Sequence, residues 1–194
     1  MFDIDGWMHE CGVIGIIRGD PAHRLLDLTY EGLLSLQHRG QEAAGLALAD
    51  GRHVRKHKSW GRVETAIPGS TMQDLAKLYN GVPFEPRLAI GHVRYATAGS
   101  SDLRNAQPHY IEPVNGRLVI ASNGDVANYR EVRLMLEREG VEINTENDGE
   151  LLLKTIEYLR TKHGLSLVDA IRRMTQMVKG FSYVFNRLDL YRSG

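Results

Sequence analysis

The sequence of 194 residues contains only one cysteine, Cys11. A single cysteine excludes an internal disulfide, and it excludes a zinc or iron–sulfur site made only of cysteines from this chain. Most lone cysteines are small buried hydrophobic residues, so the count by itself assigns Cys11 no chemistry.

The sequence also lacks net charge and long apolar runs. Lys and Arg number 24, as do Asp and Glu. This balance argues against a nucleic-acid partner, because nonspecific binding to nucleic acid needs a strong positive field. No apolar run approaches the length that spans a bilayer, so no membrane partner is expected. The first ten residues lack the basic start and apolar centre of a secretory signal, which predicts a cytoplasmic location.

Local patterns predict an alternation of strands and helices. Runs rich in β-branched residues and bounded by turn residues predict strands at 11–18, 44–49, 52–58, 87–95, 117–121, 181–185 and 188–191. Apolar residues at helical spacing predict helices at 22–37, 72–79, 129–139, 148–163 and 166–178. Asp50-Gly51 predicts a tight hairpin, and Ser166 an N-cap. A strand-rich first half and a helix-rich middle predict a layered α+β fold.

Polar clusters follow several apolar segments, where functional loops usually lie. They are Cys11-Gly12, the run from Gln37 to Gln41, the run from Gly91 to Gly99, the run from Ser122 to Asp125, and Asn147-Asp148. Two of them also have simple structural explanations. Asn-Gly is the commonest hairpin signal, and an Asp after an Asn cap is favoured by the helix dipole.

The order and spacing of these clusters resemble the N-terminal glutaminase domain of the amidophosphoribosyltransferase family, which are class II (N-terminal-nucleophile) glutamine amidotransferases. The matching segments are Cys11 to Gly15, Leu36 to Gly45, Ile90 to Tyr95 with Thr97 and Gly99, Ala106 to Pro108, and Asn123-Gly124. The resemblance runs from Cys11 to about residue 185. It implies a four-layer αββα sandwich of two antiparallel sheets.

The resemblance makes Cys11 the nucleophile and its own α-amino group the base. A free thiol has a pKa of about 8.5, whereas an α-amine titrates near pH 8 and can accept the thiol proton. The amine exists only after the Glu10–Cys11 bond is cut. Met1 to Glu10 therefore resembles a propeptide, with an expression artefact or a misassigned start as the alternative. Arg39 is implied to brace the loop around Cys11.

The remaining site residues are assigned to glutamine and to the oxyanion. Asn123 and Gly124 would supply the two N–H donors that stabilise the oxyanion. Arg94 would bind the α-carboxylate of glutamine bidentately, and Asp148 would pair with its α-ammonium group. By family position, Thr97 helps to hold the substrate.

The resemblance covers the glutaminase only, expected at residues 11–194. We expect the phosphoribosyltransferase domain of the full-length family enzyme to be absent from these residues. That domain's Mg²⁺ and the iron–sulfur cluster of some members are implied only for the full-length enzyme, so no metal or cofactor is expected in this domain. The expected partners are glutamine and either a phosphoribosyltransferase domain or a separate ammonia acceptor; a homo-oligomer is compatible. A fragment, a stand-alone glutaminase and a non-catalytic binding or regulatory relative all remain open. Ala96 stands where close relatives commonly have proline.

A Cys–His hydrolase is a further alternative, because the chain has eight histidines. His38 and His92 are the candidate bases, although no sequence feature aims either at Cys11. A histidine within an apolar strand is more often a satisfied core residue. Such a hydrolase would tolerate an N-terminal extension, whereas an N-terminal-nucleophile enzyme would not.

Overall fold

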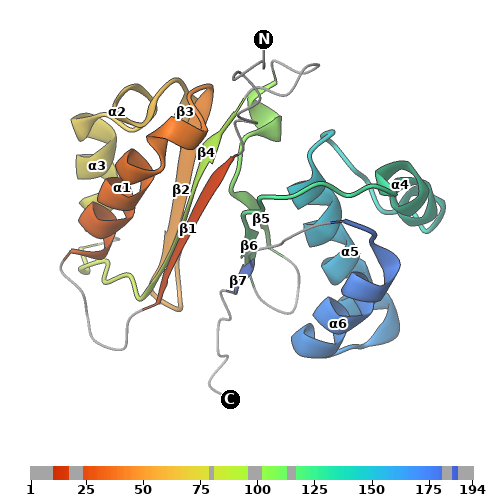
Figure 1. The fold of residues 1–194 in the computed structure, drawn as a ribbon. Helices are drawn as coiled ribbons and strands as arrows, with labels where there is room; N and C mark the ends of the chain where they lie inside the picture. The colour runs from red at the N-terminus through yellow and green to blue at the C-terminus, as the bar shows by residue number, and fades with distance from the viewer. Residues whose placement is uncertain are drawn as a thin grey trace, which may run out of the picture.

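The computed structural model describes residues 11–17, 24–78, 81–95, 102–112, 117–180 and 185–187. Its elements form four layers in the order helices, sheet, sheet, helices (Figure 1). Both sheets are antiparallel. The predicted αββα sandwich is therefore confirmed.

The first sheet has four strands in the order β1-β4-β2-β3. Their bounds are Gly12–Ile17 for β1, Ala43–Ala49 for β2, Val54–Trp60 for β3 and Leu88–Arg94 for β4. The predicted hairpin joins β2 to β3. The Asp50 carboxylate accepts hydrogen bonds of 2.7 Å from the backbone N–H groups of Arg52 and His53, and Gly51 takes a positive φ of 91°.

The second sheet has three short strands in the order β5-β6-β7. They are His109–Ile111 for β5, Leu118–Ile120 for β6 and Phe185–Arg187 for β7. We did not predict β5. The first of the two predicted C-terminal strands was expected to end at Phe185, which is wrong because β7 continues through Asn186 and Arg187. The rest of the strands predicted at 181–185 and 188–191 lies outside the described residues.

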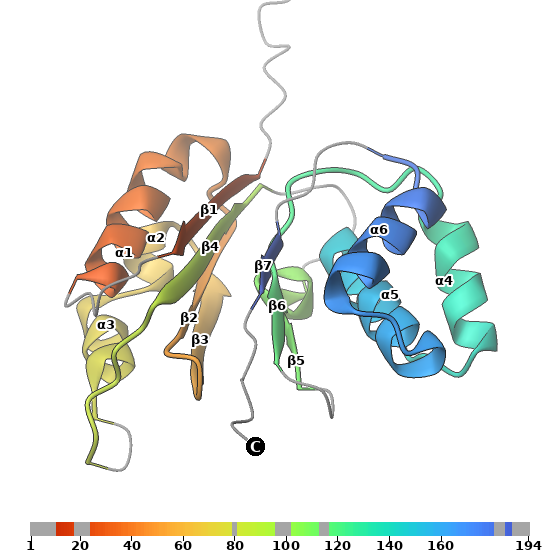
Figure 2. The ribbon, with the colours of Figure 1, turned by 90° about the horizontal axis from the view of Figure 1, so that it is seen from below.

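Helices cover the outer face of each sheet (Figure 2). On the first sheet lie α1 (Leu25–Ser35), α2 (Val63–Ala66) and α3 (Gly69–Ala76). On the second lie α4 (Tyr129–Arg138), α5 (Asp148–His163) and α6 (Leu167–Met177). The short α2 was not predicted, and α3 starts three residues before its predicted position. In the described part of the chain, no helix is long and apolar enough to cross a membrane.

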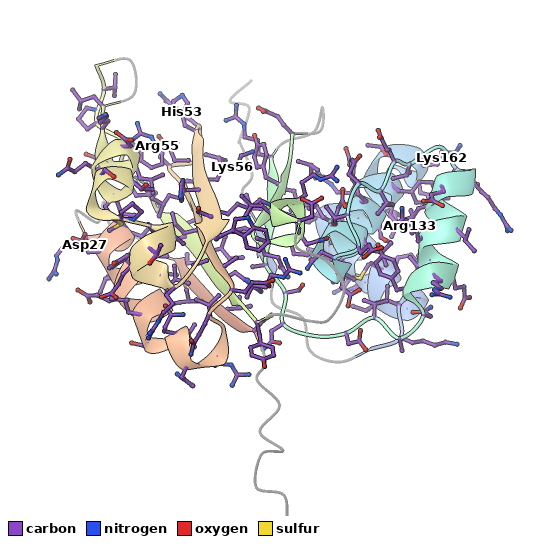
Figure 3. The ribbon with its side chains drawn as sticks, turned by 90° about the horizontal axis from the view of Figure 1, so that it is seen from above. Asp27, His53, Arg55, Lys56, Arg133 and Lys162 are labelled. Carbon is purple, nitrogen blue, oxygen red and sulfur yellow. The ribbon has the colours of Figure 1, made fainter. Side chains whose placement is uncertain are left out.

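The two faces of the first sheet have different neighbours, as β3 illustrates. Figure 3 shows Arg55 and Lys56 pointing to opposite sides of this strand. Arg55 Nη1 donates a 2.6 Å hydrogen bond to the Leu75 carbonyl of α3. The Lys56 ammonium lies 3.6 Å from the ring centre of Tyr110 in β5. One face therefore packs on helices and the other on the second sheet.

The layer between the sheets has a small apolar core. Its buried cluster consists of Ala47, Ala49, Ile90, Val119 and Ala121. Side chains alternate along a strand, so His92 and Arg94 share the face of β4 that carries Ile90. The inter-sheet layer thus changes from apolar to polar toward the end of β4, and the candidate site lies at this polar end.

Candidate active site

Three segments of the chain meet at the backbone of Cys11, which directly precedes β1. The carbonyl oxygen of Cys11 accepts a hydrogen bond of 3.1 Å from Arg39 Nε and one of 2.7 Å from Asn123 Nδ2. Arg39 comes from the first sheet's side and Asn123 from the loop after β6. The two donors fix the Cys11 backbone between the sheets.

The environment of the Cys11 thiol favours its protonated form. Burial, the largest effect, raises the pKa of the thiol above its ordinary value. The backbone N–H of Tyr95, the charge of Arg94 and the N–H of Cys11 itself act in the opposite direction but do not outweigh burial. The thiol therefore needs a base before it can act as a nucleophile.

Arg94 is buried at the end of β4 and has an acidic partner that sequence reasoning missed. Its Nε lies 3.2 Å from Oε2 of Glu42, and its carbonyl accepts a 3.0 Å hydrogen bond from the Glu42 N–H. The loop that precedes Glu42 passes close to Arg94. A Cβ at Gly40 in this loop would lie 2.5 Å from the Arg94 carbonyl carbon. A guanidinium has five N–H donors, so the Nε contact does not by itself exclude a second carboxylate.

Asn123 and Gly124 lie in the loop between β6 and Val126. Because β6 pairs only with β5 and β7 among the described strands, and Val126 bridges to Gly180, the Asn-Gly pair does not close a hairpin. The simple hairpin interpretation is therefore wrong. Asn123 is half-buried and Gly124 exposed, and the Asn123 amide has a second N–H besides the one bonded to Cys11.

Asp148 begins α5 and contacts the same loop. Asn147 caps the helix by accepting a 2.8 Å hydrogen bond from the Gly149 N–H, and Asp148 Oδ2 accepts one of 2.9 Å from the Val126 N–H. Burial, opposed by that hydrogen bond and reinforced by nearby Asp125, raises the pKa of Asp148 to about 6. The carboxylate is thus mostly ionised at pH 7 and half-protonated near pH 6.

The other candidate residues fall elsewhere. Thr97 lies outside the described residues. His38 is exposed, with Nδ1 3.0 Å from the Ser35 carbonyl. His92 is buried, and burial lowers its pKa to about 3, so it is neutral at working pH. In the part of the chain described, neither histidine is among the groups that most shift the pKa of Cys11, so the structure gives no support to a Cys–His pair.

Glu150 is a further buried polar residue that sequence reasoning missed. Its carboxylate accepts hydrogen bonds from the backbone N–H groups of Asn144, at 3.1 Å, and Thr145, at 2.6 Å. It therefore shapes the loop that leads into α5. The available signal was its position three residues after the Asn147 cap, the spacing of a capping box. Across the described residues, no group of three or more His, Cys, Asp or Glu could hold a metal ion.

Comparison with known proteins defines the class to which this fold and site belong. The family described as "Glutamine amidotransferase domain" matches residues 74–175, and the chain belongs to this family. Among its relatives are amidophosphoribosyltransferases. The chain is 33% identical over 193 residues to that of Mus musculus, covering 96% of this chain and 36% of the relative. It is 38% identical over 184 residues to that of Bacillus subtilis (strain 168), covering 94% and 35%.

Solved structures show the same likeness. One is described as the allosteric regulatory enzyme of purine biosynthesis, with a TM-score of 0.75 and 35% identity over 89% of this chain and 34% of that one. Another is the glutamine phosphoribosylpyrophosphate amidotransferase of B. subtilis complexed with ADP and GMP, with a TM-score of 0.72, 34% identity and the same coverage. The chain spans about a third of the length of these relatives.

Proposed function

We propose that this chain hydrolyses glutamine to glutamate and ammonia through a thioester on Cys11, once the Glu10–Cys11 bond has been cut. The observation that carries the proposal is the position of Cys11 between the sheets, where side chains from two other segments hold its backbone. Arg39 and Asn123 hold the carbonyl of the same residue. Cleavage would convert an amide without basicity into an amine beside a thiol whose pKa burial raises.

The amine then acts as general base and general acid. It takes the thiol proton as the sulfur attacks the carboxamide carbon of glutamine and a C–S bond forms. The resulting ammonium returns the proton to the leaving nitrogen, the C–N bond breaks, and ammonia departs. Water then attacks the thioester, which restores the thiol and releases glutamate. Glutamine and one water are consumed, and glutamate and one ammonia are formed.

Two N–H groups would stabilise the tetrahedral oxyanion. The second amide N–H of Asn123 and the backbone N–H of Gly124 belong to one loop, and Asn123 already contacts Cys11. Removal of one such donor typically lowers kcat by about 10²–10³-fold. The loop therefore contributes to the chemical step rather than to substrate binding.

Recognition of free glutamine would use one charge from β4 and one from the start of α5. Arg94, held by Glu42, would bind the α-carboxylate, and Asp148 would pair with the α-ammonium group. Thr97 would assist by family position. A substrate without these two charges, such as a peptide-bound glutamine, would be rejected because it would desolvate Arg94 and Asp148 without pairing with either.

The names of the relatives suggest the fate of the ammonia. We propose that it is delivered to phosphoribosyl pyrophosphate to form phosphoribosylamine in purine biosynthesis, on a phosphoribosyltransferase domain or a separate partner protein. A stand-alone glutaminase and a non-catalytic relative are the alternatives. Ammonia release without phosphoribosyl pyrophosphate dependence would favour the first, and glutamine binding without turnover the second. A cytoplasmic location remains a prediction.

The test compares two forms of the full chain whose N-termini are verified by mass spectrometry, one beginning at Cys11 and one retaining Met1–Glu10. We expect glutamate formation from the first form and at least about 100-fold less from the second, the usual scale of general acid–base catalysis. A diazoketone analogue of glutamine should label Cys11 only in the first form. Equal activity of both forms, or retained turnover in Cys11→Ala, would overturn the proposal.

A further inference from the structure

The residue that precedes Asn123 is held by a side chain from another segment. Gln107 Nε2 donates a 3.1 Å hydrogen bond to the carbonyl of Ser122, and Gln107 Oε1 accepts one of 2.6 Å from the Ser122 N–H. Both side chains are buried, with 4% exposed at each residue. Strand β6 ends at Ile120. Beyond that point, the Gln107 carboxamide makes the two hydrogen bonds with Ser122 that a neighbouring strand would otherwise make.

Gln107 is itself enclosed by two glycines. A Cβ at Gly45 in β2 would lie 2.3 Å from the backbone oxygen of Gln107, and a Cβ at Gly149 in α5 would lie 2.9 Å from its side-chain oxygen. A side chain at either position would need its neighbours to shift. The backbone of Gln107 is therefore packed closely against the sheet, and its carboxamide against the helix.

The neighbours of Gln107 at alternate positions hold the other half of the site. Asn105 Oδ1 accepts a 3.0 Å hydrogen bond from the Glu146 N–H, and His109 Nε2 lies 2.9 Å from Oδ1 of Asn147. Glu146 and Asn147 lead directly into Asp148. Residues 105–109 thus connect the Asn123 loop with the start of α5.

We propose that Gln107 is a positioning residue, which fixes Ser122 so that the N–H donors of Asn123 and Gly124 stay aimed at the oxyanion. This inference rests on the proposed glutaminase reaction. A misaimed donor should lower kcat by no more than deletion of that donor would. Gln107→Met, which keeps the length but loses both hydrogen bonds, should lower kcat by about 10–100-fold and change KM for glutamine by less than about 3-fold.

Gln107→Glu gives a sharper readout, because it keeps the shape and the acceptor for the Ser122 N–H. Its protonated carboxyl group can donate to the Ser122 carbonyl, whereas its carboxylate cannot. Relative to the wild type at each pH, the kcat defect of Gln107→Glu should shrink as pH falls, whereas that of Gln107→Met should stay constant. A purely structural role would not produce this difference.

The control is Thr155→Val, which removes a buried 2.7 Å hydrogen bond to Leu151 within α5. All variants are full chains processed at Cys11. We expect Thr155→Val to keep wild-type kcat, and every variant to react with iodoacetamide at Cys11 at the wild-type rate, since alkylation needs no oxyanion donors. Amide hydrogen exchange over residues 122–125 should rise in Gln107→Met and not in the control.

A wild-type kcat in Gln107→Met, a change confined to KM, or an equal loss in Thr155→Val would overturn the inference. If the wild type proves to have no glutaminase activity, the proposed function fails, and hydrogen exchange still decides whether Gln107 orders the loop. Unchanged exchange over residues 122–125 would then reject the positioning role as well.

Discussion

The carboxylate of Asp148 accepts a 2.9 Å hydrogen bond from the backbone N–H of Val126. This bond ties the first residue of α5 to the chain just after Asn123 and Gly124. The group proposed to bind the substrate ammonium therefore moves together with the loop proposed to bind the oxyanion.

Glutamine binding should depend on the ionisation of Asp148. Its pKa is raised to about 6, so the carboxylate that would pair with the α-ammonium group is lost as pH falls from 7 to 5. We expect KM for glutamine to rise over this range. Asp148→Asn should raise KM at pH 7 by about 10–100-fold, the usual value of a charge-assisted contact, and remove this pH dependence. An unaltered KM profile in the variant would contradict the assignment.

The same pKa shift predicts an effect on stability of defined sign. Because the folded pKa lies above the unfolded value of about 4, Asp148 favours folding below pH 4, and this contribution is lost as pH rises through 6. The Asn carbonyl in Asp148→Asn can still accept from the Val126 N–H. The variant should therefore have a higher Tm than the wild type at pH 7.5 and a smaller advantage at pH 4. A lower Tm at pH 7.5 would show that the ionised carboxylate is not a destabilising group.

The contact between Glu42 and Arg94 should contribute to folding. Glu42→Gln leaves the buried guanidinium without its carboxylate at 3.2 Å, and we expect a loss of about 1–3 kcal/mol in urea unfolding, below the cost for fully buried pairs because Glu42 is partly exposed. Asp74→Asn, which breaks the exposed pair with Lys77, is the control and should cost under about 1 kcal/mol. Equal losses of unfolding free energy in both variants would mean that burial of Arg94 does not strengthen its ion pair with Glu42.

The close approach of the Arg39 loop to β4 should require glycine at position 40. A Cβ there would meet backbone atoms of Arg94, the nearest at 2.5 Å, and backbone cannot rotate away. Gly40→Ala should destabilise the protein by about 1–3 kcal/mol and lower glutaminase activity. Gly15→Ala is the matched control, since nothing lies within 4 Å of a Cβ there. A Gly40→Ala protein as stable as the Gly15→Ala protein would contradict the predicted clash.

Local signals allowed part of the fold to be predicted. The bounds of α5 match the prediction from Asp148 to His163, because the Asn147 cap and Gly164, with a φ of 63°, end the helix through nearby atoms. The strands β5 and β7 were missed or misplaced because three residues give too little periodicity, and their pairing with β6 depends on distant segments.

The site was predicted from motifs, and its supporting residues were not. Arg39 and Asn123 do reach Cys11, but their roles, like that of Thr97, stay predictions. Glu42 and Gln107 lie within the matching segments Leu36 to Gly45 and Ala106 to Pro108, but the role of a buried polar residue is recognised only when its partner in another segment is known. Each acts on a residue of another segment, Glu42 on Arg94 and Gln107 on Ser122, and meets it only after the strands of its own sheet have paired.

Three alanines lie in the buried cluster that packs the two sheets together. The nucleophile directly precedes a strand of one sheet, whereas Asn123 follows a strand of the other and Asp148 begins a helix that covers it. The distance between the attacking sulfur and its partners on the other sheet's side therefore depends on the packing of the interior at Ala47, Ala49 and Ala121. An added methylene there would separate the reacting halves without touching a single residue of the active site.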